Sequence, residues 1–231
     1  RKGFNDDRGN IFFEILRFID GLEPKIVFLE NVKNLQSHDK GRTFEIIKSE
    51  LQDRGYYLDY KVLNSSEYGN VPQNRERIYI VGFKDKNVFE KFRFPKQKKL
   101  NVKITDLLEK QADEYFYYHK SKYYPQLKEE MTNKDTVYQW RRKYVRENKS
   151  NLCPTLTANM GTGGHNVPLI IDSKDIRKMT PRECARFQGY DENFIFSENM
   201  ANSHLYKQIG NSVTVSVIEA IAKEIRKALD V

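Results

Sequence analysis

Apolar residues follow two different spacings along the first third of the chain. Across 9–21 they recur every three or four positions, which predicts an amphipathic helix that ends at Gly21. The uninterrupted apolar run 26–29 predicts a strand over 25–30 that is buried on both faces, as in a parallel sheet. A second helix and two more strands follow, at 44–55, 58–62 and 78–83. This order predicts an α/β protein with a doubly wound sheet.

Two polar residues, Glu30 and Asn31, directly follow the apolar run of the first strand. In open α/β sheets ligands bind just outside the carboxyl ends of the strands. Glu30 is therefore a candidate site residue, with a simple cap of the following turn as the alternative.

The pattern changes after about Lys84, where the helical and strand-like periodicity weakens. The window 115–149 holds nine Lys or Arg against four acids, so it carries +5 of the formal +8, together with seven of the fourteen tyrosines. Cations interleaved with aromatics suit contact with phosphates and bases. A small domain with a charged surface and an aromatic core is the open alternative. We expect three parts, at 1–84, 85–177 and 178–231.

A glycine cluster at 161–164 invites comparison with a nucleotide-binding loop. Such loops open a helix, whereas this cluster leads into the strand-like run 166–171, so close approach of the backbone to a ligand or another chain is the better interpretation. Thr180, Pro181 and Glu183 then form the sequence of a capping box at a helix start. Asn211 and Ser212 precede the final helix, as a cap or as a polar cradle for a ligand.

Bulk composition narrows the class of protein. The formal charge of +8 and the pI near 9.2 fit a polyanionic partner such as nucleic acid, and mean hydropathy is −0.75. The two cysteines and four histidines show no metal-ligand spacing, so no metal is expected. No apolar run has membrane-spanning length, and no membrane partner is expected. We expect a soluble protein in a reducing, intracellular setting.

Four separated strings, in fixed order, resemble the DNA cytosine-5 methyltransferases, in particular bacterial type II modification methylases. The strings are Glu30–Val32, Gln73–Arg77, Thr180–Gly189 and Gln208–Val213. The resemblance implies a Rossmann-like methyltransferase sheet plus a smaller, irregular target-recognition domain. It also implies methyl transfer from S-adenosylmethionine to C5 of a cytosine flipped out of a specific duplex site.

The resemblance also implies roles for individual residues. Glu30 would pair with N3 and the amino group of the flipped cytosine. Arg77, and with it Arg75, would stabilise the O2 side and orient the attacking thiolate. The residues expected to line the cofactor pocket are Asn211, Ser212 and Val213.

By the same resemblance, 85–177 corresponds to the region that recognises double-stranded DNA. Thr155 and Thr157 belong to its Thr-Leu-Thr element, with Thr155 on a backbone phosphate. The cluster would lie against the major groove through Gly161, Gly163 and Gly164.

The sequence departs from the family pattern at the nucleophile. The family's Pro-Cys pair and its Gly-rich cofactor loop do not occur, and neither Cys153 nor Cys184 matches the pair. We therefore expect this chain to supply base activation and DNA recognition but not to methylate alone. Its expected partner is a missing N-terminal half, in the same polypeptide or in a separate subunit.

Two other functions remain open from the sequence. The chain is alternatively an inert DNA-binding module or subunit, or a transfer-RNA cytosine-5 methyltransferase. The recognised DNA sequence, a partner endonuclease and the oligomeric state have no readable signature.

Overall fold

The computed structural model describes residues 10–141, 143–148, 150–163 and 166–230, and these pack as two compact units. The described residues of the first unit lie within Arg1–Leu63, Glu76–Lys96 and Ile221–Val231, and those of the second within Asn64–Arg75 and Gln97–Ala220. These divisions fall at other places than the expected boundaries near 84 and 177.

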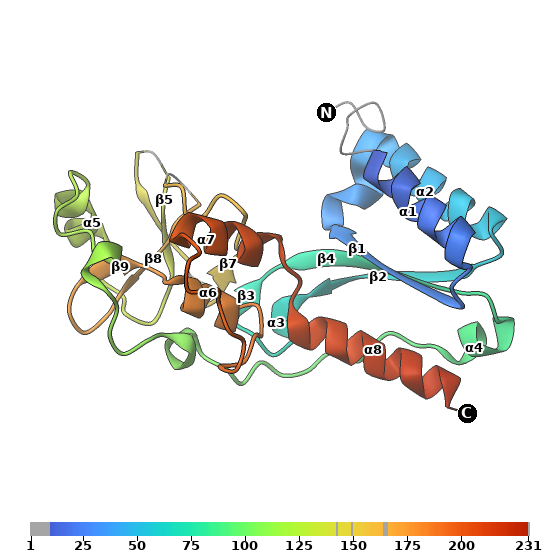
Figure 1. Ribbon diagram of the computed structural model, residues 1–231. Coiled ribbons are helices and arrows are strands. Elements are labelled where there is room, and N and C mark those ends of the chain that lie inside the picture. The colour runs from blue at the N-terminus through green and yellow to red at the C-terminus, as the bar shows by residue number, and fades with distance from the viewer. Residues whose placement is uncertain (1–9, 142, 149, 164–165, 231) are drawn as a thin grey trace. The chain divides into compact units, whose positions relative to one another are not determined.

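The first unit is built on a three-stranded sheet with the order β1-β4-β2 (Figure 1). Its strands are β1 (Ile26–Val32), β4 (Glu76–Phe83) and β2 (Tyr57–Asn64). β1 pairs with β4 antiparallel, where the sequence analysis expected a parallel neighbour. The apolar run correctly predicted a strand, but burial on both faces is wrong: only Val27 of the run is buried, and Ile26, Phe28 and Leu29 are partly exposed.

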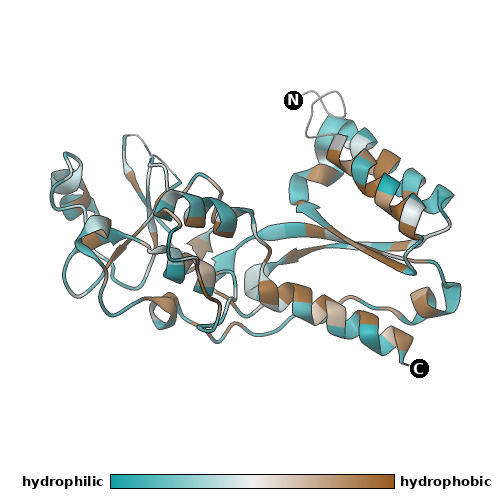
Figure 2. Ribbon diagram, in the orientation of Figure 1, coloured by the Kyte–Doolittle hydropathy of each residue, from teal (hydrophilic) through white to brown (hydrophobic). Residues whose placement is uncertain are grey.

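Helices cover both faces of this sheet (Figure 1). On one face lie α1 (Asn10–Leu22) and α2 (Arg42–Asp53), and the 3-10 segment η2 (Lys33–Gly41) joins β1 to α2. Their apolar sides pack on the strands in a core that includes Leu16, Ile19, Phe44, Ile47, Leu51, Ile78 and Ile80. Figure 2 shows the apolar and polar residues alternating along these helices and along α8.

The opposite face of the sheet presents the intervening residues of β4. Tyr79, Val81 and Phe83 are at most 1% exposed. The Phe83 ring lies 5.2 Å from that of Phe92, which follows the short helix α4 (Lys86–Lys91). The part of α8 (Val215–Leu229) from Ile221 onward runs along this side (Figure 1). β4 is thus the most deeply buried strand of the unit.

The second unit combines short strands and short helices. An antiparallel sheet has the order β6-β5-β8-β9, and a separate parallel pair joins β3 to β7. The strands are β3 (Gln73–Asn74), β5 (Tyr138–Trp140), β6 (Val145–Glu147), β7 (Cys153–Pro154), β8 (Pro168–Ile171) and β9 (Ile176–Lys178). The helical segments are α3 (Ser65–Tyr68), η3 (Ile104–Leu107), η4 (Glu114–Phe116), α5 (Tyr124–Glu130), α6 (Pro181–Arg186) and α7 (Asn202–Asn211).

A buried ion cluster links β9 to α6 in this unit. Arg177 is fully buried and pairs with Glu183 Oε1 at 2.7 Å and with Asp172 Oδ2 at 2.5 Å. Burial alone would lower the pKa of Arg177, but hydrogen bonds and charge from Glu183 and Asp172 raise it. Glu183 also forms the capping box with Thr180, which confirms that prediction. One carboxylate therefore fixes both the helix start and the buried cation.

Two kinds of feature are absent from the described residues. No helix there is long and apolar enough to cross a membrane. No group of three or more His, Cys, Asp or Glu in those same ranges could hold a metal ion.

Candidate functional site

Glu30 and Arg77 form an ion pair on neighbouring strands of the first unit. Arg77 Nε lies 3.1 Å from Glu30 Oε1, and the two side chains are 14% and 25% exposed. Glu30 is opposite Tyr79 and Arg77 is opposite Val32, so the pair lies diagonally on one face of the sheet. Strand pairing thus brings two of the predicted catalytic residues together.

The environment of Arg77 fixes its orientation. Burial lowers the pKa of its guanidinium, and the charge of Glu30 opposes that shift. Arg77 Nη1 donates to the Glu76 carbonyl oxygen at 2.8 Å, while Nε faces Glu30. A carboxyl beside an oriented cation can bind a planar ring that carries hydrogen-bond donors and acceptors along one edge.

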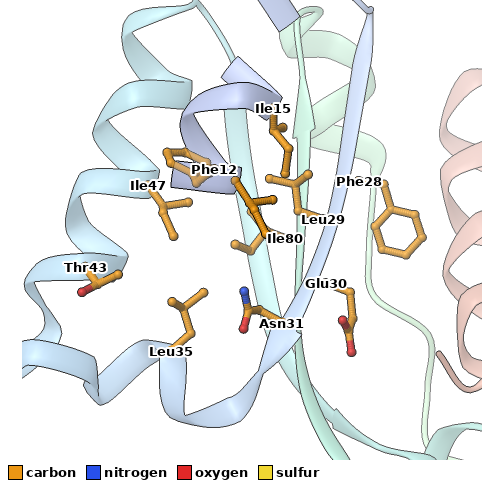
Figure 3. Close-up of a pocket in the computed structure, with 11 residues that line it drawn as sticks. Phe12, Ile15, Phe28, Leu29, Glu30, Asn31, Leu35, Thr43, Ile47 and Ile80 are labelled. Carbon is orange, nitrogen blue, oxygen red and sulfur yellow. The ribbon is translucent and has the colours of Figure 1, made fainter. Parts of the chain in front are cut away.

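A hollow of about 400 Å³ lies beside Glu30 in the first unit (Figure 3). Figure 3 shows Phe28 and Glu30 on one side of β1 and Leu29 and Asn31 on the other, as alternation along a strand requires. Asn31 Oδ1 accepts a hydrogen bond from the Val32 N–H at 2.8 Å. The remaining lining residues are mostly apolar: Ile11, Phe12, Ile15, Leu35, Thr43, Ile47 and Ile80.

Arg75 makes a different kind of contact, although it is only two residues from Arg77. Its guanidinium belongs to the second unit and is 2% exposed. It donates to main-chain carbonyl oxygens, at 2.8 Å to Leu156, 2.6 Å to Ser212 and 3.4 Å to Gly210. Arg75 therefore binds main-chain carbonyl oxygens, whereas Arg77 pairs with the carboxylate of Glu30.

The two predicted DNA-contacting threonines lie just after β7 and are half-buried. Thr155 Oγ1 donates to the Asn74 carbonyl oxygen at 2.7 Å. Thr157 Oγ1 lies 2.7 Å from Asn159 Oδ1. A hydroxyl-to-phosphate hydrogen bond from either threonine therefore requires an exchange of partner.

The glycine cluster contains two different environments. A Cβ on Gly161 would lie 2.3 Å from the ring of Tyr206, so its close approach is to this chain itself. Gly163 has φ +89°, is exposed, and has open space where a Cβ would stand. Gly164 lies outside the described residues.

The predicted cofactor residues stand between two helices. Asn211 is the last residue of α7, and α8 begins at Val215. Ser212 Oγ donates to the Ile209 carbonyl oxygen at 2.8 Å, so this hydroxyl satisfies the end of α7 and does not cap the start of α8. Asn211 is exposed and Val213 half-buried.

The comparisons with known proteins agree on one family. The family model described as C-5 cytosine-specific DNA methylase matches residues 1–227. The chain belongs to this family. Among its relatives, the type II methyltransferase M.Bsp6I of Bacillus sp. (strain RFL6) is 56% identical over 99% of this chain and 74% of its own length. M.SsoII of Shigella sonnei is 40% identical over 100% of this chain and 60% of its own length.

Solved structures with the same fold include two methyltransferases. The Entamoeba histolytica methyltransferase EhMeth matches with a TM-score of 0.73 and 17% identity, over 97% of this chain and 70% of that chain. The Dnmt2 methyltransferase of S. pombe matches with a TM-score of 0.71 and 19% identity, over 97% and 74%. The predicted methyltransferase α/β fold class is confirmed by these matches.

The cysteines of this methylase chain are unsuited to nucleophilic attack. Cys153 and Cys184 are both fully buried. Burial raises the pKa of each thiol, so the thiolate is disfavoured at both positions.

Gln73 is a residue that sequence reasoning named only as part of a string. It is fully buried, and its Nε2 donates to the Phe187 carbonyl oxygen at 2.6 Å. Its Oε1 accepts from the Leu156 N–H at 3.1 Å. The sequence shows a polar residue two positions before Arg75, but it does not show which groups that residue binds.

Proposed function

We propose that this chain is part of an enzyme that transfers a methyl group from S-adenosylmethionine to C5 of a flipped-out cytosine in a specific duplex DNA site. The observation that carries the proposal is the Glu30–Arg77 ion pair of the first unit, whose carboxylate residue also lines the hollow. Membership in the cytosine-specific methylase family supplies the substrate class.

The chemistry explains why a carboxyl and a cation are needed together. Cytosine C5 is a weak nucleophile until a thiolate adds to C6, and electron density then moves toward N3 and O2. A carboxyl that shares a proton with N3 and a cation near O2 stabilise this charge. We assign the first role to Glu30 and the second to Arg77.

The cofactor would supply the methyl group as a sulfonium. Asn211 and Val213 fit one wall of its site, because the Asn211 carboxamide is exposed and Val213 is half-buried. The Ser212 hydroxyl is already bonded to Ile209, so Ser212 shapes the turn. We assign these three residues to part of the cofactor pocket.

The nucleophile has to come from elsewhere in the enzyme, because both cysteines here are buried. The first unit offers a surface for the part that carries it. On α1, the side chains of Ile11, Phe18 and Leu22 are 60%, 68% and 75% exposed. Large apolar side chains clustered on a surface mark an interaction site. We propose that the nucleophile-bearing part, in the same polypeptide or in a separate subunit, covers this side of α1.

Double-stranded DNA is the proposed partner of the second unit. The basic excess of 115–149 supplies attraction to phosphates. We assign the backbone contact to Thr155, a further DNA contact to Thr157, and the groove-facing loop to the glycine cluster that includes Gly161 and Gly163.

Transfer of tritium from labelled S-adenosylmethionine to duplex DNA tests the proposed function. The chain alone should give no transfer, and a complementing fragment that carries the Pro-Cys pair should restore it. Methylation by the chain alone would contradict our account of the nucleophile. Duplex binding without restored transfer would identify an inert DNA-binding module, and preference for transfer RNA over duplex DNA would identify an RNA methyltransferase.

A further inference from the structure

Two residues of the second unit hold the main chain of Leu156 from both sides. Gln73 Oε1 accepts from the Leu156 N–H, and Arg75 Nη1 donates to the Leu156 carbonyl oxygen. All three residues are at most 2% exposed, so water does not compete for these bonds. The peptide groups before and after Leu156 therefore have defined positions.

The pairing of β3 with β7 extends this hold along the chain. Gln73 lies opposite Cys153, and Asn74 lies opposite Pro154. The Asn74 carbonyl oxygen also accepts the hydroxyl of Thr155. The segment that enters the predicted DNA contact is thus bound to 73–75 at successive residues.

The same guanidinium holds the turn after α7. Arg75 Nη2 donates to the carbonyl oxygens of Ser212 and Gly210. Gly210 also packs directly on the neighbouring segment, because a Cβ there would lie 2.2 Å from the Thr157 carbonyl carbon. The two segments touch and share one cation, so a shift of either changes the contacts of the other.

The chemistry of arginine suits this junction. Its planar fork presents several donors in fixed directions, whereas a lysine ammonium is a single compact charge. Two of the three accepting carbonyls lie at the end of α7, where the helix dipole favours a cation.

We propose that Gln73 and Arg75 are positioning residues that couple the DNA-contacting segment 155–159 to the cofactor-side turn 210–213. The proposal rests on the proposed function, which assigns DNA to the first segment and the cofactor to the second. DNA that moves or orders 155–159 then alters 210–213 through the shared guanidinium. By linkage, occupation of the turn alters DNA affinity by the same factor.

Amide hydrogen exchange of the 231-residue chain, with and without short mixed-sequence duplex DNA, tests the coupling. In the native chain, duplex DNA should slow exchange at 155–159 and also slow exchange at 209–213 by about fivefold or more, the lower end of typical coupling between sites. In Arg75→Lys the slowing at 209–213 should fall below about twofold, while that at 155–159 persists. A purely structural role predicts equal loss at both segments.

The matched control is Arg93→Lys in the first unit. Arg93 also donates to main-chain carbonyl oxygens, those of Glu90 and Phe92. Its substitution should leave the slowing of exchange at 155–159 and at 209–213 unchanged. If Arg75→Lys fails to fold, Gln73→Met replaces it; this change removes the acceptor for the Leu156 N–H and also the donor to the Phe187 carbonyl oxygen, and it keeps Arg75. Unchanged exchange at 209–213 in the DNA-bound native chain overturns the coupling, as does full slowing in a folded variant. Failure of the native chain to bind duplex DNA, measured in the same samples, instead overturns the proposed function.

Discussion

The two units hold their candidate site residues by different means. In the first, Glu30 and Arg77 are placed by the register of β1 against β4, and their ion pair stays partly exposed. In the second, Gln73 and Arg75 are buried and bonded to main chain of segments far away in sequence.

We propose that this difference separates reacting groups from supporting groups. A partly exposed pair on a rigid sheet can reach a substrate without disturbing the core. A buried polar junction is costly to break, because each freed group loses its partners without regaining water. Substitutions in the first unit's site should therefore change activity, and substitutions in the second unit's junctions should change stability or coupling.

The largest effect expected is on catalysis by Glu30→Gln. The variant keeps the size of the side chain but cannot share a proton with N3, so methyl transfer by the completed enzyme should fall about 100- to 10,000-fold. Steady-state tritium transfer measures this. Glu45→Gln, an exposed position paired with Lys48 on α2, is the control and should keep full activity. An unchanged urea midpoint would show that Glu30 is not a structural residue, and retained activity would remove it from the mechanism.

The next effect is on stability, by Arg177→Met. The change leaves the buried carboxylates of Glu183 and Asp172 without their cation, which should cost about 3–5 kcal/mol of unfolding free energy. Urea unfolding followed by circular dichroism provides the measurement. Arg54→Met is the matched case in the first unit, since Arg54 also pairs with two acids but at a partly exposed site. Equal losses in the two variants would contradict the contrast between the units.

A glycine-to-alanine pair should change stability in opposite directions. Gly210→Ala forces a methyl group into the main chain at 157–158 and should destabilise by about 1–3 kcal/mol. Gly21→Ala meets nothing within 4 Å and lies in α1, so it should stabilise by up to about 1 kcal/mol. Thermal unfolding compares both variants with the native chain. An unchanged stability in Gly210→Ala would show that the main chain at 157–158 can move to make room for a methyl group.

The smallest effect expected is a stability slope in acid. Burial opposes ionisation of Asp172, but hydrogen bonds, including those from the Asp175 N–H and Arg177, hold its pKa below the ordinary value of 3.8. Its stabilising contribution is therefore complete above that value and is lost as pH falls through the lower pKa of the folded state. Urea midpoints from pH 5 to pH 2.5 should fall less steeply in Asp172→Asn, and parallel curves would exclude this group as the cause.

Sequence reasoning succeeded where the signal is local. The periodicity of 9–21 located α1, and the spacing of Thr180 and Glu183 located the capping box. Strand pairing and partners are not local. The string Gln73–Arg77 does not show that Arg77 pairs with Glu30, or that Arg75 binds main-chain carbonyl oxygens far away in sequence.

The glycines and the last turn show the same limit. The sequence marks Gly161 as special, but the reason, contact with Tyr206, lies 45 positions away. The helix α7 had no expected counterpart, because polar residues at 207, 208 and 211 hide its short apolar side. Because α7 was not expected, the bond of the Ser212 hydroxyl to the end of that helix was not expected either.

The contacts of Gln73 and Arg75 with Leu156, Gly210 and Ser212 all use peptide groups, not side chains. The hydrogen bonds of the junction therefore do not depend on the identity of the side chains at the positions that they hold. Positions such as Thr157 and Asn159 can be randomised in a mutant library while the framework that presents them stays in place. A few side-chain substitutions on the unaltered scaffold would then suffice for recognition of a new DNA sequence. Such a scaffold allows DNA specificity to diversify quickly between related enzymes.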